Sequence, residues 1–304
     1  MGISALEISA SSRYNKSANS STGDVLVRNN YTDSPAPGGI TSHNRVFLDL
    51  LNRKLRGPFT IKDTAEILVI DHKKASRLLA YWAEHGWLSR IRNGLYITVP
   101  LGALNPTERR EDPWIIATRL FAPCYIGGWS ACEHWGITEQ LFKDIAVFSS
   151  HKVRTKEMVL QDTRYVITHV PENKMFGLTL TWRGTTRVSI SDPSRTIIDI
   201  LNDPSMGGGI RNIAEMVQNY FESDHKDVDR LLEYARRADN KSINKRLGFI
   251  IETLNLDFPD IIKFCTSNLS KGYSLLDTTI KKTGRLTRRW NLQINTEVEK
   301  RNYR

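Results

Sequence analysis

The chain has 304 residues, 43 Lys and Arg against 33 Asp and Glu, a net charge of +10 and a sequence pI near 9.5. Its hydrophobic content is ordinary for a globular protein, no apolar run approaches the ~20 residues of a membrane-spanning helix, and the N-terminus lacks a secretory signal pattern. The three cysteines cannot all pair and fit no common zinc spacing, which argues against a disulfide scaffold or zinc domain and favours a cytoplasmic protein without a metal or other cofactor.

Charge is distributed unevenly along the chain. Residues 1–40 are rich in Ser, Asn, Thr, Gly and Pro and carry three cationic and three anionic side chains. They bury too little apolar surface to offset the entropy lost on ordering, so we predict a disordered tail. Residues 41–100 carry ten Lys/Arg and five Asp/Glu, and residues 271–304 carry nine and three. The positive excess in these two segments favours a polyanionic partner without identifying it.

Helical periodicity and turn residues predict three helices after the tail. Residues 44–55 place apolar side chains at helical spacing, and a Gly-Pro pair ends the run. Thr60 and Asp63 have the spacing of a capping box and open a second helix. Asp71 is a suitable N-cap for a third helix, which is expected to end near Gly86.

The third predicted helix has two faces of different character. One face is apolar, is expected to pack in the core, and consists of Ala75, Leu78, Leu79 and Trp82. The other face carries Lys73, Ser76, Arg77 and Ala80, three and four residues apart. The candidate DNA-contacting residues of this helix are Lys73, Lys74, Ser76, Arg77 and Tyr81. For Tyr81, packing against the protein and contact with a DNA phosphate are equally favoured.

A hairpin is predicted directly after this helix. Asn93 and Gly94 separate two β-prone runs, and Arg90 and Arg92 stand two apart on the first strand, where we expect both on one side. A basic helix followed by a basic hairpin is typical of a winged helix-turn-helix, whose helix enters the major groove of DNA while the hairpin contacts the backbone or minor groove. We therefore predict a DNA-binding domain of this kind over residues 41–100.

Beyond a linker at residues 101–112, residues 113–304 predict a small mixed sheet with helices and then a mostly helical C-terminal region, so the chain as a whole is expected to be α+β. The expected helices cover residues 114–121, 130–135, 194–201, 210–221, 228–238 and 243–254. The expected strands cover residues 144–148, 164–170, 178–182, 186–190 and 289–295. Arg195 and Asp199 stand four apart and are expected to pair on a helix surface.

The run ASRLLAYWAEHGWLSRIRNGLYITVP, residues 75–100, resembles the N-terminal winged-helix region of the AbiEi family of bacterial antitoxins. Further similar segments follow in the same order, and the resemblance covers roughly residues 42–296. These segments are YIGGWSACEHWGITEQ, VSISDPSRTIIDIL, GGG, INKRLGFIIETL and RWNLQIN. Two features depart from the family pattern: residues 1–40 are longer than its usual N-terminus, and Ser194 stands where its segment usually has a glutamate.

The resemblance implies a regulator from an abortive-infection toxin–antitoxin system. Family members repress their own operon by binding double-stranded operator DNA, which we expect here as inverted repeats. They oppose a toxin of the nucleotidyltransferase (AbiEii) class through the larger C-terminal part, without requiring a stable complex. The family is not known for enzymatic activity, so no catalytic residue is expected. By motif position, the DNA-facing residues are Lys73, Lys74, Ser76 and Arg77 in the helix and Arg90 and Arg92 in the hairpin.

A basic cluster near the C-terminus has two open interpretations, a solvated tail or a surface for antitoxicity and an anionic partner. It consists of Lys281, Lys282, Arg285, Arg288 and Arg289. His134 lies among aromatic residues without a recognisable nucleophile in the sequence, so packing is favoured over catalysis.

Two alternative functions remain open. The first is a solitary winged-helix transcriptional regulator with a sensing C-terminal domain and no toxin. The second is a metal-dependent nuclease, because Asp162 followed by Glu172 and Lys174 is an Asp…Glu-x-Lys pattern that can hold Mg²⁺. Pro171 interrupts the strand on which such a pattern normally lies, which disfavours the nuclease.

Overall fold

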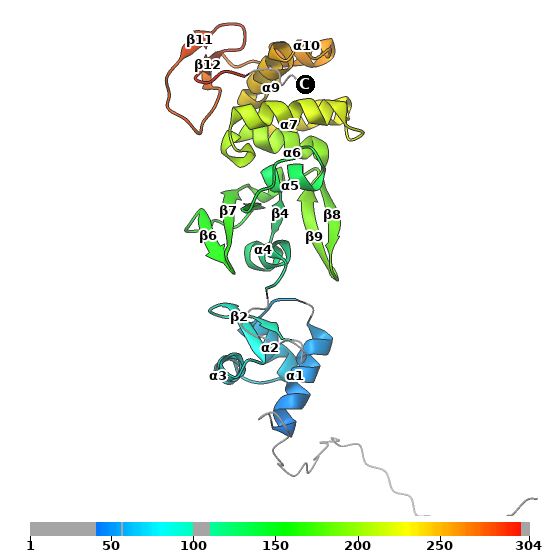
Figure 1. Cartoon of the computed structure of the whole chain (residues 1–304), viewed down its shortest axis with the longest axis vertical. Helices are drawn as coiled ribbons and strands as arrows, with labels where there is room; N and C mark the ends of the chain where they lie inside the picture. The colour runs from blue at the N-terminus through cyan, green and yellow to red at the C-terminus, as the bar shows by residue number, and fades with distance from the viewer. Residues whose placement is uncertain (1–40, 56, 100–109, 299–304) are drawn as a thin grey trace, which may run out of the picture. The chain divides into compact units, whose positions relative to one another are not determined.

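The computed structural model describes residues 41–55, 57–99 and 110–298, and the secondary structure in these ranges is mixed α+β, as expected (Figure 1). The tail predicted at residues 1–40 and most of the linker predicted at residues 101–112 lie outside the described residues. None of the helices in the described ranges is long and apolar enough to cross a membrane.

Three helices and three short strands make up residues 42–98. They are α1 (Ser42–Lys54), β1 (Phe59–Thr60), α2 (Ile61–Leu68), α3 (His72–Glu84), β2 (Leu88–Arg92) and β3 (Leu95–Thr98). The three predicted helices and the hairpin are confirmed, and β1 adds an unpredicted strand to an antiparallel sheet of order β1-β3-β2. The capping box is also present: Thr60 Oγ1 accepts from the backbone N–H of Asp63, whose carboxylate accepts from the backbone N–H of Thr60.

One apolar core joins these helices and strands. Its buried side chains are Leu51, Phe59, Leu68, Leu79, Trp82, Leu88 and Tyr96. Each large apolar side chain of this kind contributes about 1.5–3 kcal/mol to folding when it leaves water. Because α3 gives Leu79 and Trp82 to the core, the opposite face of the same helix is left to solvent.

A six-stranded mixed sheet forms the next part of the chain, in the order β6-β7-β5-β4-β9-β8. Its strands are β4 (Cys124–Ile126), β5 (Ile145–Ser149), β6 (Glu157–Leu160), β7 (Thr163–His169), β8 (Leu178–Arg183) and β9 (Thr186–Ser191). The β4–β9 and β5–β7 pairs are parallel, and the other three pairs are antiparallel. Four of these strands were predicted, whereas β4 and β6, with three and four residues, are too short to give a clear pattern.

Two different apolar cores pack against the two faces of this sheet, as the alternation along β5 shows. Val147 belongs to the core that includes residues of α4 (Pro113–Phe121). Its neighbour Phe148 belongs to a different core, with Trp129 of α5 (Gly128–His134). Successive side chains of a strand point to opposite faces, so these two cores lie on opposite faces of β5; α5 contributes to both, because its Ala131 belongs to the first core.

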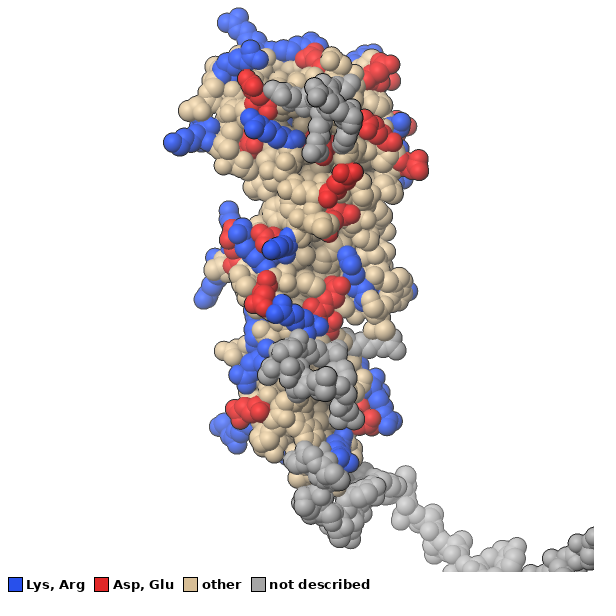
Figure 2. All heavy atoms as spheres, viewed as in Figure 1, with Lys and Arg blue, Asp and Glu red and all other residues tan. Residues whose placement is uncertain are grey.

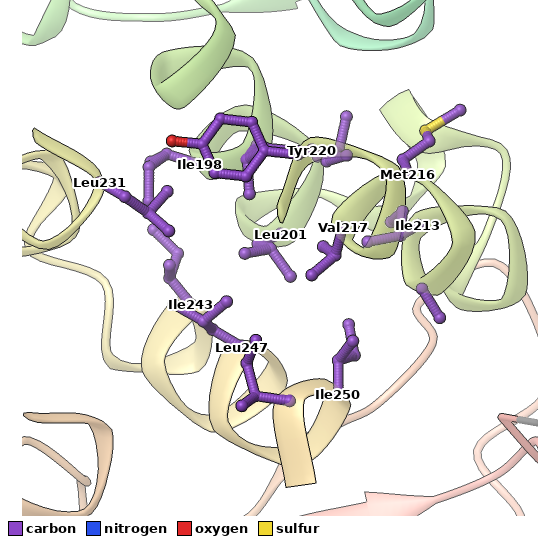
Figure 3. Packing of buried hydrophobic residues seen from close by; sticks show 14 of the residues in the cluster. Ile198, Leu201, Ile213, Met216, Val217, Tyr220, Leu231, Ile243, Leu247 and Ile250 are labelled. Carbon is purple, nitrogen blue, oxygen red and sulfur yellow. The ribbon is translucent and has the colours of Figure 1, made fainter. Parts of the chain in front are cut away.

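The C-terminal region is helical, as predicted, and ends in a small sheet that was predicted only in part. Its helices are α6 (Pro193–Asn202), α7 (Ile210–Glu222), α8 (Val228–Ala238), α9 (Lys241–Thr253) and α10 (Pro259–Ser267). Figure 3 shows α6, α7, α8 and α9 directing apolar side chains into one shared core. The small sheet, of order β10-β12-β11, consists of β10 (Ser274–Leu275), β11 (Arg285–Thr287) and β12 (Leu292–Ile294).

The prediction that Arg195 and Asp199 pair on a helix surface is wrong in one respect. They do pair, with 2.9 Å between Arg195 Nε and Asp199 Oδ1, but their side chains are only 5% and 4% exposed. The hydroxyl of Tyr125, on β4, donates to the same carboxylate. Burial raises the pKa of Asp199 to about 6, because desolvation of the carboxylate outweighs the attraction of Arg195. Charge spacing alone could not show that α6 is buried on nearly all sides.

Two cations of α9 are also structural. The Arg246 guanidinium is buried and donates to backbone carbonyls at the end of α6 and at β10, namely those of Leu201, Asn202, Leu275 and Leu276. Burial lowers the pKa of Arg246 to about 10. Lys245 donates to the carbonyl of Gly272 and the hydroxyl of Ser274. These cations therefore hold the C-terminal segment against α9 and are not available to a partner.

Gly248 of α9 lies very close to the ring of Trp290, and this contact leads to a prediction about stability. A Cβ at Gly248 would overlap the six-membered ring of Trp290, a side chain that is 1% exposed. We expect Gly248→Ala to lower the free energy of unfolding by about 1–3 kcal/mol, the usual cost of overpacking a core. Gly272→Ala is the matched control, because a Cβ there meets nothing within 4 Å. Thermal unfolding of both variants checks this, and equal melting temperatures would contradict it.

Candidate nucleic-acid interface

The third helix, α3, follows a tight turn after α2, and its first turn is capped. Val69 ends α2 in the left-handed region, with φ of 53°. Asp71 then caps α3, because its carboxylate accepts from the backbone N–H of Lys74 at 2.9 Å. Ala75, Leu79 and Trp82 are buried on the inner face. The rotation of α3 about its axis is therefore fixed by packing and by its cap.

The outer face of α3 carries exposed cations, as the sequence predicted. Lys73, Lys74 and Arg77 are exposed, Ser76 is half-buried, and Tyr81 is 42% exposed. The tyrosine ring lies 4.0 Å from the ring of a histidine one turn later, so part of its surface is already covered. Lysine and arginine heads that reach solvent on one helix face can meet phosphates or base edges.

The first turn of α3 has a charge pattern that local stability disfavours. Helix N-termini carry a partial positive charge and favour Asp or Glu, yet this turn contains Lys73 and Lys74 and no acidic residue. By contrast, α1 and α2 carry i,i+4 ion pairs, which are Arg53–Asp49 and Lys62–Glu66. A helix N-terminus with two added lysines is a favourable place for a phosphate group.

The hairpin presents two more cations beside a buried residue. Arg90 and Arg92 are exposed, whereas Ile91 between them is 8% exposed. The pairing of β2 with β3 is irregular between the two arginines, and Gly94 takes φ of +79° in the turn. The guanidinium of Arg90 also lies 5.5 Å from the ring centroid of Tyr96. Both arginines thus reach solvent from one strand, as predicted.

These cations form no ion pair within the part of the chain that the structure describes. Within residues 41–55, 57–99 and 110–298, no carboxylate forms an ion pair with the five cations of α3 and the hairpin, which are Lys73, Lys74, Arg77, Arg90 and Arg92. Uncompensated charges repel one another, which raises the energy of the free protein. An anionic partner would remove that repulsion.

The basic cluster near the C-terminus lies on an exposed segment around β11. Four of its members, Lys281, Lys282, Arg285 and Arg288, are exposed and form no ion pair within the described part of the chain. Arg289 is also exposed but pairs with Glu252 of α9. Figure 2 shows Lys and Arg side chains gathered over the region of β11 and β12. Two exposed apolar residues, Ile280 and Leu286, lie among them.

The residues of the nuclease pattern are not brought together. Asp162 precedes β7 in a tight turn and pairs with Arg110, whereas Glu172 follows the other end of the same strand. The seven residues of β7 separate these two carboxylates by about 20 Å at ~3.3 Å per residue. Lys174 donates to backbone carbonyls at the end of α8. In the described ranges no group of three His, Cys, Asp or Glu could hold a metal ion.

His134 lies between two aromatic residues, as predicted. Its ring centroid is 5.4 Å from that of Trp114 and 4.8 Å from that of Trp135. Desolvation, followed by the charge of Arg183, lowers the pKa of His134. The sequence did not predict that His134 and Arg183 line a common cavity, because the residues that bring them together are far apart in the chain.

Sequence reasoning also missed polar groups at the candidate interface. His72, the first residue of α3, and Asn93, at the hairpin turn, are both exposed beside the predicted cations. Asn93 was interpreted only as a turn residue, although a hairpin tip is the part of a wing that reaches the minor groove. Its position in the hairpin could have identified it.

A scan against protein-family models and a search of curated proteins find no match to this chain. The assignment of function therefore depends on the arrangement of its own residues.

Proposed function

We propose that this chain is a bacterial antitoxin of the AbiEi type, acting in the cytoplasm, that represses its own operon and neutralises a nucleotidyltransferase toxin. In this proposal residues 41–100 are a winged helix-turn-helix, with α3 as the recognition helix and the β2–β3 hairpin as the wing. The observation that carries it is the exposed cationic face of α3, whose first turn contains no acidic residue, directly followed by two exposed arginines on a hairpin.

Each DNA contact in this proposal has a physical role. Lys73 and Lys74, at the N-terminus of α3, bind phosphate, because helix and side-chain charges add there. Arg77, one turn further on, reaches base edges in the major groove. Ser76 and the small Ala80 allow the helix to approach closely. Arg90 and Arg92 bind the backbone or the minor groove from the wing. Inverted-repeat operators would engage two copies.

The C-terminal cluster is the proposed antitoxicity surface. It is exposed, cationic and largely without ion pairs in the described ranges, and it includes two exposed apolar side chains. A surface with this composition attracts an anionic macromolecule at long range and contacts it through apolar groups at short range. A stable complex with the toxin is not required for it to act.

The experiment that tests both activities is coexpression with the product of the adjacent gene, scoring growth and output from the chain's own promoter together. We expect growth to be restored and promoter output to fall. Lys281→Gln/Lys282→Gln/Arg285→Gln should lose growth rescue and keep repression. The matched control is Lys241→Gln/Lys263→Gln/Lys271→Gln, which neutralises three exposed lysines of the same region. Loss of rescue in both triple variants alike would refute the assignment of this surface.

A solitary regulator with a sensing C-terminal domain is the second candidate. One observation favours it: a cavity of about 280 Å³ in the α/β part, lined by Trp114, Glu133 and Arg183 among others, is large enough for a small effector. Repression without any growth effect from the adjacent gene would support this candidate over the antitoxin.

A further inference from the structure

The cavity in the α/β part has charged groups of both signs on its walls. Its lining includes Asp112 and Trp114 at the start of α4, Glu133 and His134 of α5, and Arg183 at the end of β8, together with Ile145. At about 280 Å³ it falls just below the range of roughly 300–1,000 Å³ that is usual for ligand pockets. The cavity therefore fits a small molecule and not a folded partner.

The cationic group in the cavity is held in place but lacks a counter-charge. The guanidinium carbon of Arg183 lies 3.8 Å from the ring centroid of Trp114. Its Nε is buried and has no hydrogen-bond partner, and no carboxylate pairs with it within the described ranges. Buried donors in proteins are nearly always satisfied, so a cavity-lining arginine with an unsatisfied donor and no counter-charge favours an anionic acceptor in that cavity. A planar guanidinium favours a carboxylate as that acceptor.

Each of the two carboxylates in the same cavity has only one oxygen in a hydrogen bond within the described residues. One oxygen of Asp112 accepts from the backbone N–H of Trp114, and one oxygen of Glu133 accepts from the backbone N–H of Phe142. Within the described residues their second oxygens make no hydrogen bond. A ligand with a cationic donor, such as an ammonium group, satisfies them.

Nearby groups favour an organic ligand over an ion. The pKa of His134 is lowered, so its imidazole is neutral at pH 7 and can donate one hydrogen bond and accept another. Trp114 and Ile145 supply apolar wall for a side chain. No group of three potential ligands in the described ranges could hold a metal ion.

We propose that this cavity binds a small zwitterion of the α-amino-acid class, whose carboxylate meets Arg183, whose ammonium group meets Glu133 and Asp112, and whose side chain lies on Trp114 and Ile145. Arg183 forms no ion pair with Asp112 or Glu133 in the described ranges, and a molecule that carries both charges could bridge the two sides of the cavity. This proposal goes beyond operator binding and antitoxicity and does not depend on either.

Binding is measured with the purified full-length chain by thermal shift and calorimetry. Each standard L-amino acid is tested at about 10 mM, a concentration that detects millimolar affinity. The strongest binder is then compared with its decarboxylated amine and with its deaminated acid. We expect one or more amino acids to raise the melting temperature, because a ligand that binds only the folded state stabilises it. We expect both analogues to bind about tenfold more weakly or worse, because each leaves one charged wall unpaired.

Three variants complete the test. Arg183→Gln and Glu133→Gln should each weaken binding by about tenfold or more. Arg187→Gln is the matched control, because Arg187 stacks on the exposed Trp182 of the same hairpin, with 4.7 Å to the ring centroid, and does not line the cavity. It should bind as the unmodified chain does. Glu133 is exposed, so its variant remains informative if Arg183→Gln fails to fold.

Three results would overturn the proposal. The first is that no amino acid binds at this concentration. The second is that the amine or the acid alone binds as tightly as the amino acid. The third is that the amino acid raises the melting temperature of folded Arg183→Gln and Glu133→Gln as much as that of the unmodified chain. This would show that the amino acid acts through the solvent and not by binding in the cavity.

Discussion

An Arg77→Ala/Arg92→Ala variant should bind operator DNA at least about 30-fold more weakly than the unmodified chain, because each lost arginine contact is worth about 1–3 kcal/mol. Both side chains are exposed and form no ion pair within the described residues, so the melting temperature should change little. Fluorescence anisotropy with the DNA upstream of the chain's own gene measures the affinity.

The matched control for this variant is Arg164→Ala/Arg230→Ala. It removes the same charge from two exposed, ion-paired arginines outside residues 41–100. We expect its affinity to fall far less, through the change in net charge alone. A folded Arg77→Ala/Arg92→Ala variant that represses its promoter normally would show that another surface binds DNA.

Asp199→Ala should destabilise the chain by about 3–5 kcal/mol, because it leaves the buried Arg195 guanidinium without its counter-charge. The hydroxyl of Tyr125 would also lose its acceptor. Asp49→Ala is the matched control, since Asp49 also pairs with an arginine at i,i+4 spacing but has 55% of its side chain exposed. That control should cost no more than about 1 kcal/mol. Differential scanning calorimetry compares the two.

A triple variant separates the cost of an unpaired charge from the value of the ion pair. Tyr125→Phe/Arg195→Met/Asp199→Leu replaces all three polar groups with apolar ones, and we expect it to be more stable than Asp199→Ala. If the triple variant is instead the less stable of the two, the ion pair itself stabilises the fold. Arg195 Nη1 has no hydrogen-bond partner, which is consistent with an ion pair that is incompletely satisfied.

The sequence predicted those elements whose signals are local. The capping box at Thr60, the cap at Asp71 and the Asn93-Gly94 turn each specify a backbone conformation within a few residues. Four helices of the C-terminal region, α6 to α9, were predicted because their apolar periodicity is strong, whereas α10 was not predicted. In contrast, β6, β10 and β11 have two to four residues each and are defined by their pairing with β7 and β12. A short run carries too little periodicity to predict such a strand.

The cations show what sequence patterns could not decide. Arg77 and Arg195 each lie on a helix in a basic or mixed-charge context, yet Arg77 is exposed and Arg195 is buried. The difference arises because α6 is surrounded by the sheet and by other helices, whereas α3 is covered on one side. Arg183 is a similar case: its stacking on Trp114 depends on tertiary contacts across almost seventy residues. Charge positions could be read from the sequence, but burial could not.

We propose that one surface binds duplex DNA, largely through phosphate contacts; it consists of Lys73, Lys74, Arg77, Arg90 and Arg92. The most direct test is the operator affinity of the full-length chain between about 50 and 200 mM salt, a range over which the release of counterions by phosphate contacts changes affinity measurably. If three to five of these cations contact phosphate, the slope of log K against log salt should lie between about −2.7 and −4.5, at about −0.9 per contact. A slope near zero would show that phosphate contacts contribute little to binding, and it would contradict the proposed DNA-binding surface.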